Sequence, residues 1–123
     1  MKFKINNKTW EIIEIPQEEM REQLRIRNDK ACETGKYYGL TYEDTQTIYL
    51  DKDLCFERKR TTLLHELMHC YIITFVTHQE RTYNEEDLAD LSANSFDIIK
   101  EIIELYFNEN KINMKEASYE SND

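Results

Sequence analysis

The sequence predicts an α+β fold in which a small sheet, mixed or antiparallel, precedes two long helices. Short runs rich in β-branched and aromatic residues occur in two pairs, and polar turn residues separate the members of each pair. In the second half the apolar residues take a helical period instead. The 123-residue chain has only two Gly and one Pro, which favours long elements with few connections.

The first β-hairpin is expected at the N-terminus. Apolar and lysine side chains alternate over Lys2–Ile5, a polar turn follows at Asn6–Lys8, and a second β-prone run covers Trp10–Ile15. Pro16 ends that run, and proline suits the first turn of a helix. We expect this helix over Glu18–Asn28, with a narrow apolar face turned inward.

A second hairpin is expected from the β-prone runs Tyr37–Tyr42 and Thr47–Leu50, which flank a polar turn. Asp51 and Asp53 then offer side chains that could cap the next helix. That helix is predicted to run from about Leu54 to Phe75.

The last helix has the clearest start. Asn84 is a favoured capping residue, and the acids of Glu85–Asp87 lie at the positive end of the helix dipole. Apolar residues then keep a helical period to about Phe107. Because the chain is polar beyond this point, we expect one domain over residues 1–107 and a polar, flexible C-terminal tail over 108–123.

Charge and cysteine content restrict the partners and the compartment. A net charge of −9 repels nucleic acid backbones and anionic lipid, so neither direct nucleic-acid binding nor membrane binding is expected. The three cysteines form no CxxC pair and no disulfide framework, as in a cytoplasmic protein with reduced thiols. The first residues lack the apolar region of a signal peptide, and no run approaches the roughly 18 apolar residues of a membrane span.

The motif His65-Glu66-Leu67-Met68-His69 (HExxH) falls inside an apolar stretch of the predicted long helix. Residues four apart lie on one helical face, so His65 and His69 can reach one Zn²⁺ at about 2.0–2.1 Å. Glu66 lies off that face but can reach a water on the metal and act as general base. In an apolar core these polar groups need partners. The alternative is therefore two core histidines satisfied by neighbouring acids, without metal.

A catalytic zinc site needs a third protein ligand. Ile72 and Phe75 stand where the metzincin extension would place Gly and His, so that class is excluded. His78 lies beyond the predicted helix end, and we expect it to be a solvated loop residue rather than a ligand. An acid of the last helix remains. The candidates are Glu85, Glu86, Asp87 and Asp90.

Helical spacing separates these acids into two groups. Glu86 and Asp90 share a stripe with two alanines, which would let this helix approach the HExxH helix closely. Glu85 and Asp87 fall off that stripe, and capping with dipole complementation explains both. Asp90 suits either a hydrogen bond to the free ring nitrogen of a ligand histidine or a solvated helix face.

The segments TLLHELMH (Thr62–His69) and EDLADLSA (Glu86–Ala93) together resemble the ImmA/IrrE-like metallopeptidases of bacteria, phages and mobile elements. The resemblance covers roughly residues 37–107. It implies a compact zincin-like domain of the gluzincin type (HExxH…E), with Glu86 as third metal ligand beside His65 and His69. It also implies that the stretch Gly39–Asp51 is the strand region ahead of the metal helix.

Motif and resemblance together predict a zinc metalloendopeptidase, a hydrolase that cleaves a cytoplasmic protein by Glu66-assisted attack of a zinc-bound water. By resemblance, the substrate would be a repressor of a phage or mobile element. Thr47–Leu50 is read either as an edge strand that receives an extended peptide or as an ordinary structural strand.

Two other functions compete with proteolysis. One is a non-catalytic, zinc-stabilised binding module that sequesters a regulator, although binding alone does not need Glu66. The other is an acidic decoy that competes with nucleic acid for a basic protein. The net charge permits a decoy but explains none of the HExxH residues.

Overall fold

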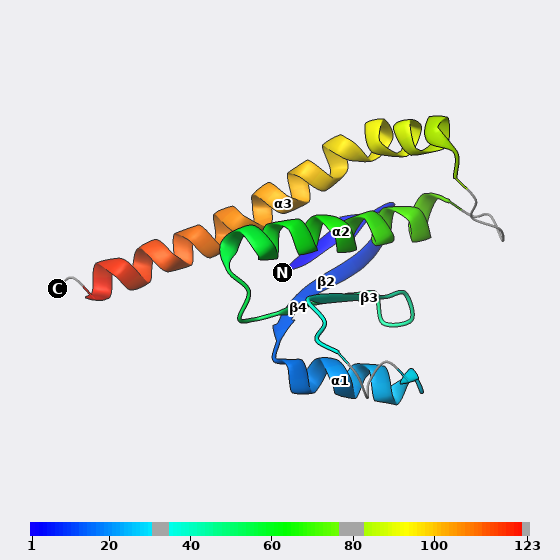
Figure 1. Cartoon of the computed structure of the whole chain (residues 1–123). Helices are drawn as coiled ribbons and strands as arrows, with labels where there is room; N and C mark the ends of the chain where they lie inside the picture. Colours follow the sequence, from blue (N-terminus) through cyan, green and yellow to red (C-terminus); the bar gives the residue numbers. More distant parts are fainter. Residues whose placement is uncertain (31–34, 77–82, 122–123) are drawn as a thin grey trace. The chain divides into compact units, whose positions relative to one another are not determined.

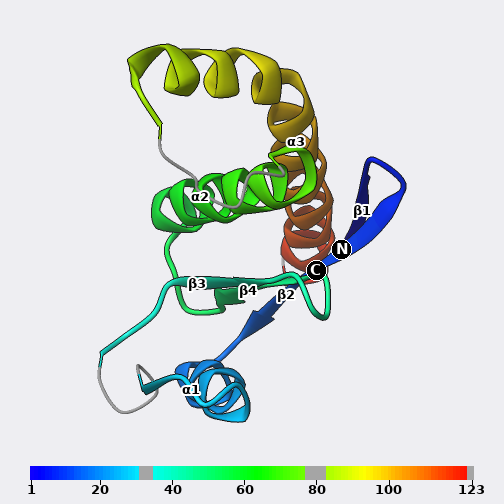
Figure 2. The ribbon, with the colours of Figure 1, turned by 90° about the vertical axis from the view of Figure 1, so that its right-hand side faces the viewer.

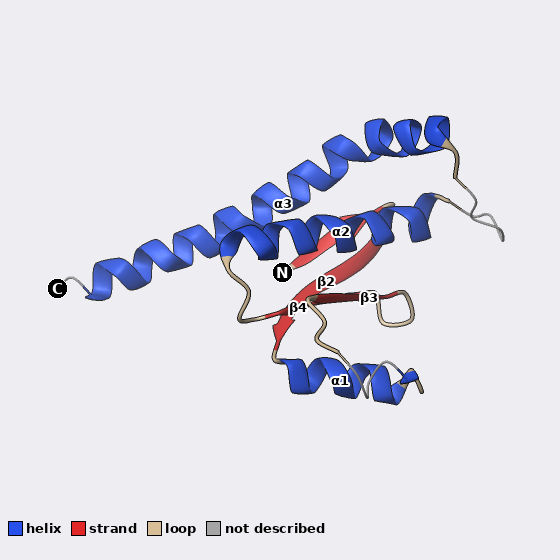
Figure 3. Ribbon diagram, viewed as in Figure 1, coloured by secondary structure: helices blue, strands red, loops and turns tan. Residues whose placement is uncertain are grey.

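The computed structural model describes residues 1–30, 35–76 and 83–121, the last thirteen of them by their backbone alone. Its elements are β1 (Lys2–Ile5), β2 (Lys8–Ile15), α1 (Gln17–Ile26), β3 (Gly39–Tyr42), β4 (Thr47–Asp51), α2 (Phe56–Phe75) and α3 (Glu85–Ser121) (Figures 1 and 3). The chain forms two compact units, Met1–Thr82 and Tyr83–Asp123. Among the described residues, no helix combines the length and apolar character that crossing a bilayer requires.

The first unit contains a four-stranded mixed sheet in the order β1-β2-β4-β3. Both expected hairpins are present, because β1 pairs antiparallel with β2 and β3 pairs antiparallel with β4. Asn6 and Asn7 turn the first hairpin with φ of 50° and 67°, a left-handed conformation that Asn tolerates better than most residues. The parallel pairing of β2 with β4 joins the two hairpins. The predicted α+β fold with a small sheet is therefore confirmed.

The strand Thr47–Leu50 was a candidate edge strand, and the pairing shows that this expectation was wrong. These residues belong to β4, which has β2 on one side and β3 on the other. Four of the five β4 residues are buried, as expected for an interior strand. The edges of the sheet are β1 and β3.

Helix α2 covers one face of the sheet, and α1 lies on the other side (Figures 1 and 2). The core under α2 is apolar and comes from β1, β2 and β4 and from the inward stripe of the helix. Its fully or almost fully buried members include Phe3, Ile5, Trp10, Ile12, Ile48, Leu50, Leu63 and Leu67. On the other face, α1 buries Met20 and Leu24, the inward positions of its apolar face.

The start of α2 differs from the expectation in its cap. The helix begins at Phe56 with Cys55 at the N-cap position and no side-chain capping bond. Asp51 is used elsewhere, since its carboxylate accepts hydrogen bonds from Gln17 Nε2 at 2.7 Å and from the Asp53 N–H at 2.9 Å. A long-range contact to α1 therefore takes the acid that local sequence offered as a cap.

The second unit consists of α3, which begins as predicted. Asn84 Oδ1 accepts the Asp87 N–H at 2.8 Å, and an Asp87 carboxylate oxygen accepts the Asn84 N–H at 3.3 Å, which forms a reciprocal cap. The predicted end near Phe107 was wrong, because the helical backbone continues to Ser121. Residues 108–121 contain neither Gly nor Pro to stop the helix. The flexible tail over 108–123 and the single domain over 1–107 stay predictions.

One glycine sets how closely β3 and α2 approach. A Cβ atom on Gly39 would lie 2.8 Å from Thr62 Cγ2 and 2.9 Å from Glu66 Cγ. Both distances are shorter than normal carbon–carbon contacts, so a larger residue would push the strand and the helix apart.

We therefore expect Gly39→Ala to lower the free energy of unfolding by about 1–3 kcal/mol, the usual cost of overpacking. Urea titration followed by circular dichroism measures this change. Thr62→Ser removes one of the two clashing atoms, so the double variant should recover part of the loss. An alanine variant as stable as the wild type would show that the two elements are not in contact at this position.

Candidate metal centre

Helix α2 carries all three chemistry-bearing residues of the HExxH motif, but it does not expose them equally. Its sheet-facing stripe repeats every three or four residues and comprises Thr62, Leu63, Glu66, Leu67, Cys70 and Tyr71. Glu66 is therefore buried, with 6% of its surface exposed. His65 and His69 lie about 100° around the helix from that stripe and are exposed. The alternative of two core histidines is wrong for this reason.

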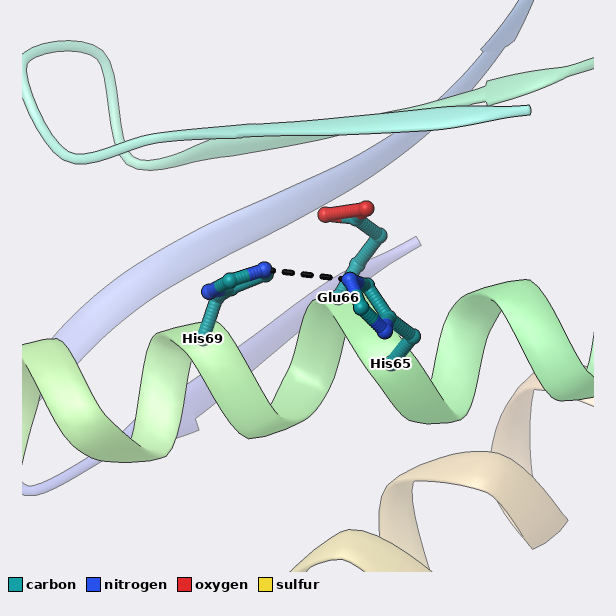
Figure 4. Close-up of side chains that lie close together, drawn as sticks. All are labelled: His65, Glu66 and His69. Atoms are coloured by element: carbon teal, nitrogen blue, oxygen red, sulfur yellow. Dashed lines mark hydrogen bonds between the residues drawn. The ribbon is translucent and has the colours of Figure 1, made fainter. Parts of the chain in front are cut away.

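The two histidine rings converge on one point (Figure 4). The Nε2 atoms of His65 and His69 are 3.2 Å apart, and the ring planes stand 77° to one another. Two nitrogen ligands at about 2.0–2.1 Å on a tetrahedral ion are separated by about 3.3–3.4 Å. The observed separation is close to that value. It equally suits a hydrogen bond between two neutral rings, one donating and one accepting.

Glu66 extends from the same turn of α2 towards β3 (Figure 4). Its carboxylate and the two ring nitrogens lie within 4.8 Å of one another, so the three residues form a group that could hold a metal ion. The set combines two imidazoles with a carboxylate oxygen, a combination that Zn²⁺ accepts well. The carboxylate is also close enough to hydrogen-bond to a water on an ion held by the two rings.

One oxygen of Glu66 already has a partner. Thr41 Oγ1, on β3, donates a hydrogen bond to Glu66 Oε2 at 2.6 Å. Thr41 was not among the expected site residues, because Tyr37–Tyr42 was expected only as a strand. The one available signal was that Gly39 and Thr41 are two apart and so share a strand face. Nothing in the local sequence says that this face meets Glu66.

Cys70 follows His69 directly but is a poor candidate ligand. Burial raises the pKa of its thiol to about 12, and the nearby Glu66 carboxylate adds to the rise. Its side chain is fully buried, and it does not belong to the group that His65, Glu66 and His69 form. Cys70 therefore belongs to the apolar stripe of α2, as does Tyr71, which the structure buries.

The acids proposed as third ligand belong to the second unit. Glu86 lies in the first turn of α3, and its side chain is exposed. Glu85 and Asp90 are exposed as well, and Asp87 forms the reciprocal cap with Asn84. The assignment of Glu86 as a metal ligand stays a prediction. His78, the remaining histidine, lies outside the described residues.

Comparison of the chain with protein-family models, with curated proteins and with solved structures gives no match.

Proposed function

We propose that this protein is a zinc-dependent metallopeptidase of the ImmA/IrrE-like type that hydrolyses a peptide bond in a protein substrate. The observation that carries the proposal is the geometry on α2. Two exposed imidazoles converge to 3.2 Å, with a buried carboxylate beside them. Burying a carboxylate costs free energy unless it is hydrogen-bonded or paired, and such carboxylates are common at functional sites. This one adjoins two side chains of the kind that bind metal ions.

Some of these residues would bind the metal ion, and Glu66 would transfer a proton. His65 and His69 would hold Zn²⁺ through Nε2, and Glu86 would complete the protein ligands. The ion would lower the pKa of a water towards about 7 and polarise the substrate carbonyl. Glu66 would take the proton of the attacking water and pass it to the amine that leaves when the peptide C–N bond breaks. Among the described residues, no hydrogen bond occupies Glu66 Oε1, so this oxygen is available for that step.

The open edge of β3 supports a peptide as the substrate. The Asp51 N–H donates to the Tyr38 carbonyl at 2.9 Å, and in the same register Leu40 pairs with Tyr49. Antiparallel pairing alternates, so the backbone N–H and C=O groups of Gly39 and Thr41 point away from β4. An extended peptide could pair with these groups as an added strand. Because both residues face α2, such a peptide would lie beside Glu66.

The first prediction concerns the metal. Protein expressed in metal-replete medium should contain one zinc per chain, and His65→Ala or His69→Ala should lose it, because removing a ligand greatly weakens a three-ligand site. Elemental analysis after gel filtration measures the content, and His78→Ala serves as the matched control. Wild-type protein without zinc would remove the basis of the proposed function.

The second prediction separates cleavage from binding. Glu66→Gln should keep the zinc and the fold, because the amide oxygen can still accept the Thr41 hydrogen bond. It should lose about 10²–10⁴-fold in turnover, because an amide cannot take the water's proton. The measurement is mass spectrometry of new protein N-termini after incubation with a host lysate. Glu57→Gln, an exposed change on the same helix, is the control.

Two results would count against the role of Glu66. Equal cleavage by Glu66→Gln and wild type would show that the carboxylate is not the base. Loss of zinc from Glu66→Gln would make Glu66 a ligand instead. If wild-type protein holds zinc but generates no new N-terminus, a sequestering module becomes the better description of this chain.

The third prediction concerns the third ligand. Glu86→Ala should weaken zinc binding sharply, measured by competition with a chelating dye, while Glu85→Ala should leave it nearly unchanged. Both changes remove one charge from the first turn of α3, which costs each about 0.3–1 kcal/mol of helix stability, so comparing them cancels that effect. Release of zinc by Asp90→Ala and not by Glu86→Ala would place the ligand one turn further along α3.

A further inference from the structure

Two residues of β3, Thr41 and Gly39, restrain the Glu66 side chain. Thr41 Oγ1 lies 2.6 Å from Glu66 Oε2 and 3.3 Å from the main-chain oxygen of the same residue. A hydroxyl has one proton to donate, and a carboxylate is the stronger acceptor. The bond to Oε2 is therefore the principal one, and it fixes the end of the side chain.

Gly39 restrains the stem of the same side chain. The position that its Cβ would occupy is 2.9 Å from Glu66 Cγ and 3.3 Å from Cδ, so the strand backbone lies directly against the glutamate. Gly39 and Thr41 are two apart and face α2 together. A free glutamate side chain loses conformational entropy when it is ordered. In this fold the strand imposes that order before any substrate arrives.

The consequence is an asymmetric carboxylate. Oε2 is bound to β3, while Oε1 makes no hydrogen bond among the residues that the structure describes. The histidine nitrogens lie within 4.8 Å of the carboxylate. Without the Thr41 bond the carboxylate could rotate, and its two oxygens would exchange places. With the bond, one oxygen is kept for whatever His65 and His69 hold.

We propose that Thr41 is a positioning residue, whose hydroxyl orients the Glu66 carboxylate towards the group held by His65 and His69. Thr41 itself touches neither substrate nor metal and acts through Glu66. The inference rests on the proposed function, because it assigns Glu66 a task at the metal. A purely structural hydrogen bond between β3 and α2 is the competing explanation, and it predicts an effect on stability alone.

The test uses Co²⁺-loaded full-length protein with acetohydroxamate, whose binding is followed by visible absorption. A hydroxamate chelates the metal, and its proton passes to a neighbouring carboxylate, so its affinity reports the orientation of Glu66 without any known substrate. Thr41→Val keeps the shape of the side chain but removes the donor, and it should weaken binding by about tenfold or more. Thr41→Ser keeps the donor and should bind within about twofold of wild type.

Two controls separate orientation from stability. Thr47→Val removes a comparable hydroxyl on β4, which donates to the carbonyl of the turn residue Thr45 at 3.0 Å. This change should not alter acetohydroxamate binding. In a Glu66→Gln background, Thr41→Val should cause no further loss, because the hydroxyl then has no carboxylate to orient. All variants should bind Co²⁺ with equal stoichiometry.

Unchanged acetohydroxamate affinity in Thr41→Val, together with a lower melting temperature, would overturn the proposal and leave a structural bond. If Thr41→Val does not fold, Thr41→Ala repeats the test without placing a methyl group against the carboxylate. Failure of the proposed function looks different. In that case the wild type binds no Co²⁺, or wild type and Glu66→Gln bind acetohydroxamate with the same affinity. Either result would contradict both proposals.

Discussion

The contact between β3 and α2 at Gly39 is the constraint on which the candidate site depends. The helix approaches the strand so closely that no side chain fits between them, as the 2.8 Å from a Cβ on Gly39 to Thr62 Cγ2 shows. That approach puts Glu66 inside the core and within reach of a hydroxyl on the strand. The orientation of α2 about its own axis follows from the same contact. Once Glu66 faces β3, His65 and His69 lie to one side of it around the helix axis, outside the buried stripe and exposed.

A single helix thus serves both the core and the site. Leu63 and Leu67 bury their side chains completely, and Glu66 lies between them on the same stripe. A carboxylate among apolar side chains would be unfavourable without a partner, and the Thr41 hydroxyl offsets part of that cost. A core composed for stability alone would place an apolar residue here. An acid at this position fits the role that we propose for Glu66 better than a role in packing alone.

The mixed sheet explains how a short edge strand is held in place beside Glu66. β3 has only four residues, but its partner β4 is an interior strand that also pairs with β2. The network of Gln17, Asp51 and the Tyr37 backbone ties the entry of β3 to the start of α1 and the end of β4. The entry of the strand is thereby anchored. Its outer edge remains unpaired among the described residues, which leaves backbone groups for a peptide.

The sequence by itself determined the features that depend on neighbours along the chain. Alternation and the Asn6-Asn7 turn predicted the first hairpin, and the four-residue spacing of His65 and His69 predicted their convergence. Asn84 and the acids after it predicted the start of α3. In each case the interacting groups are separated by a few residues, so residue type and helical or strand period suffice to bring them together.

Only the tertiary structure decided which distant segments meet. The interior position of β4 follows from its parallel pairing with β2, which no local pattern specifies. Asp51 does not cap α2 because Gln17, 34 residues earlier, donates to its carboxylate. Thr41 reaches Glu66 across 25 residues of sequence for a similar reason. Such contacts depend on the packing of whole elements against one another, and many sequences with the same local periods would pack differently.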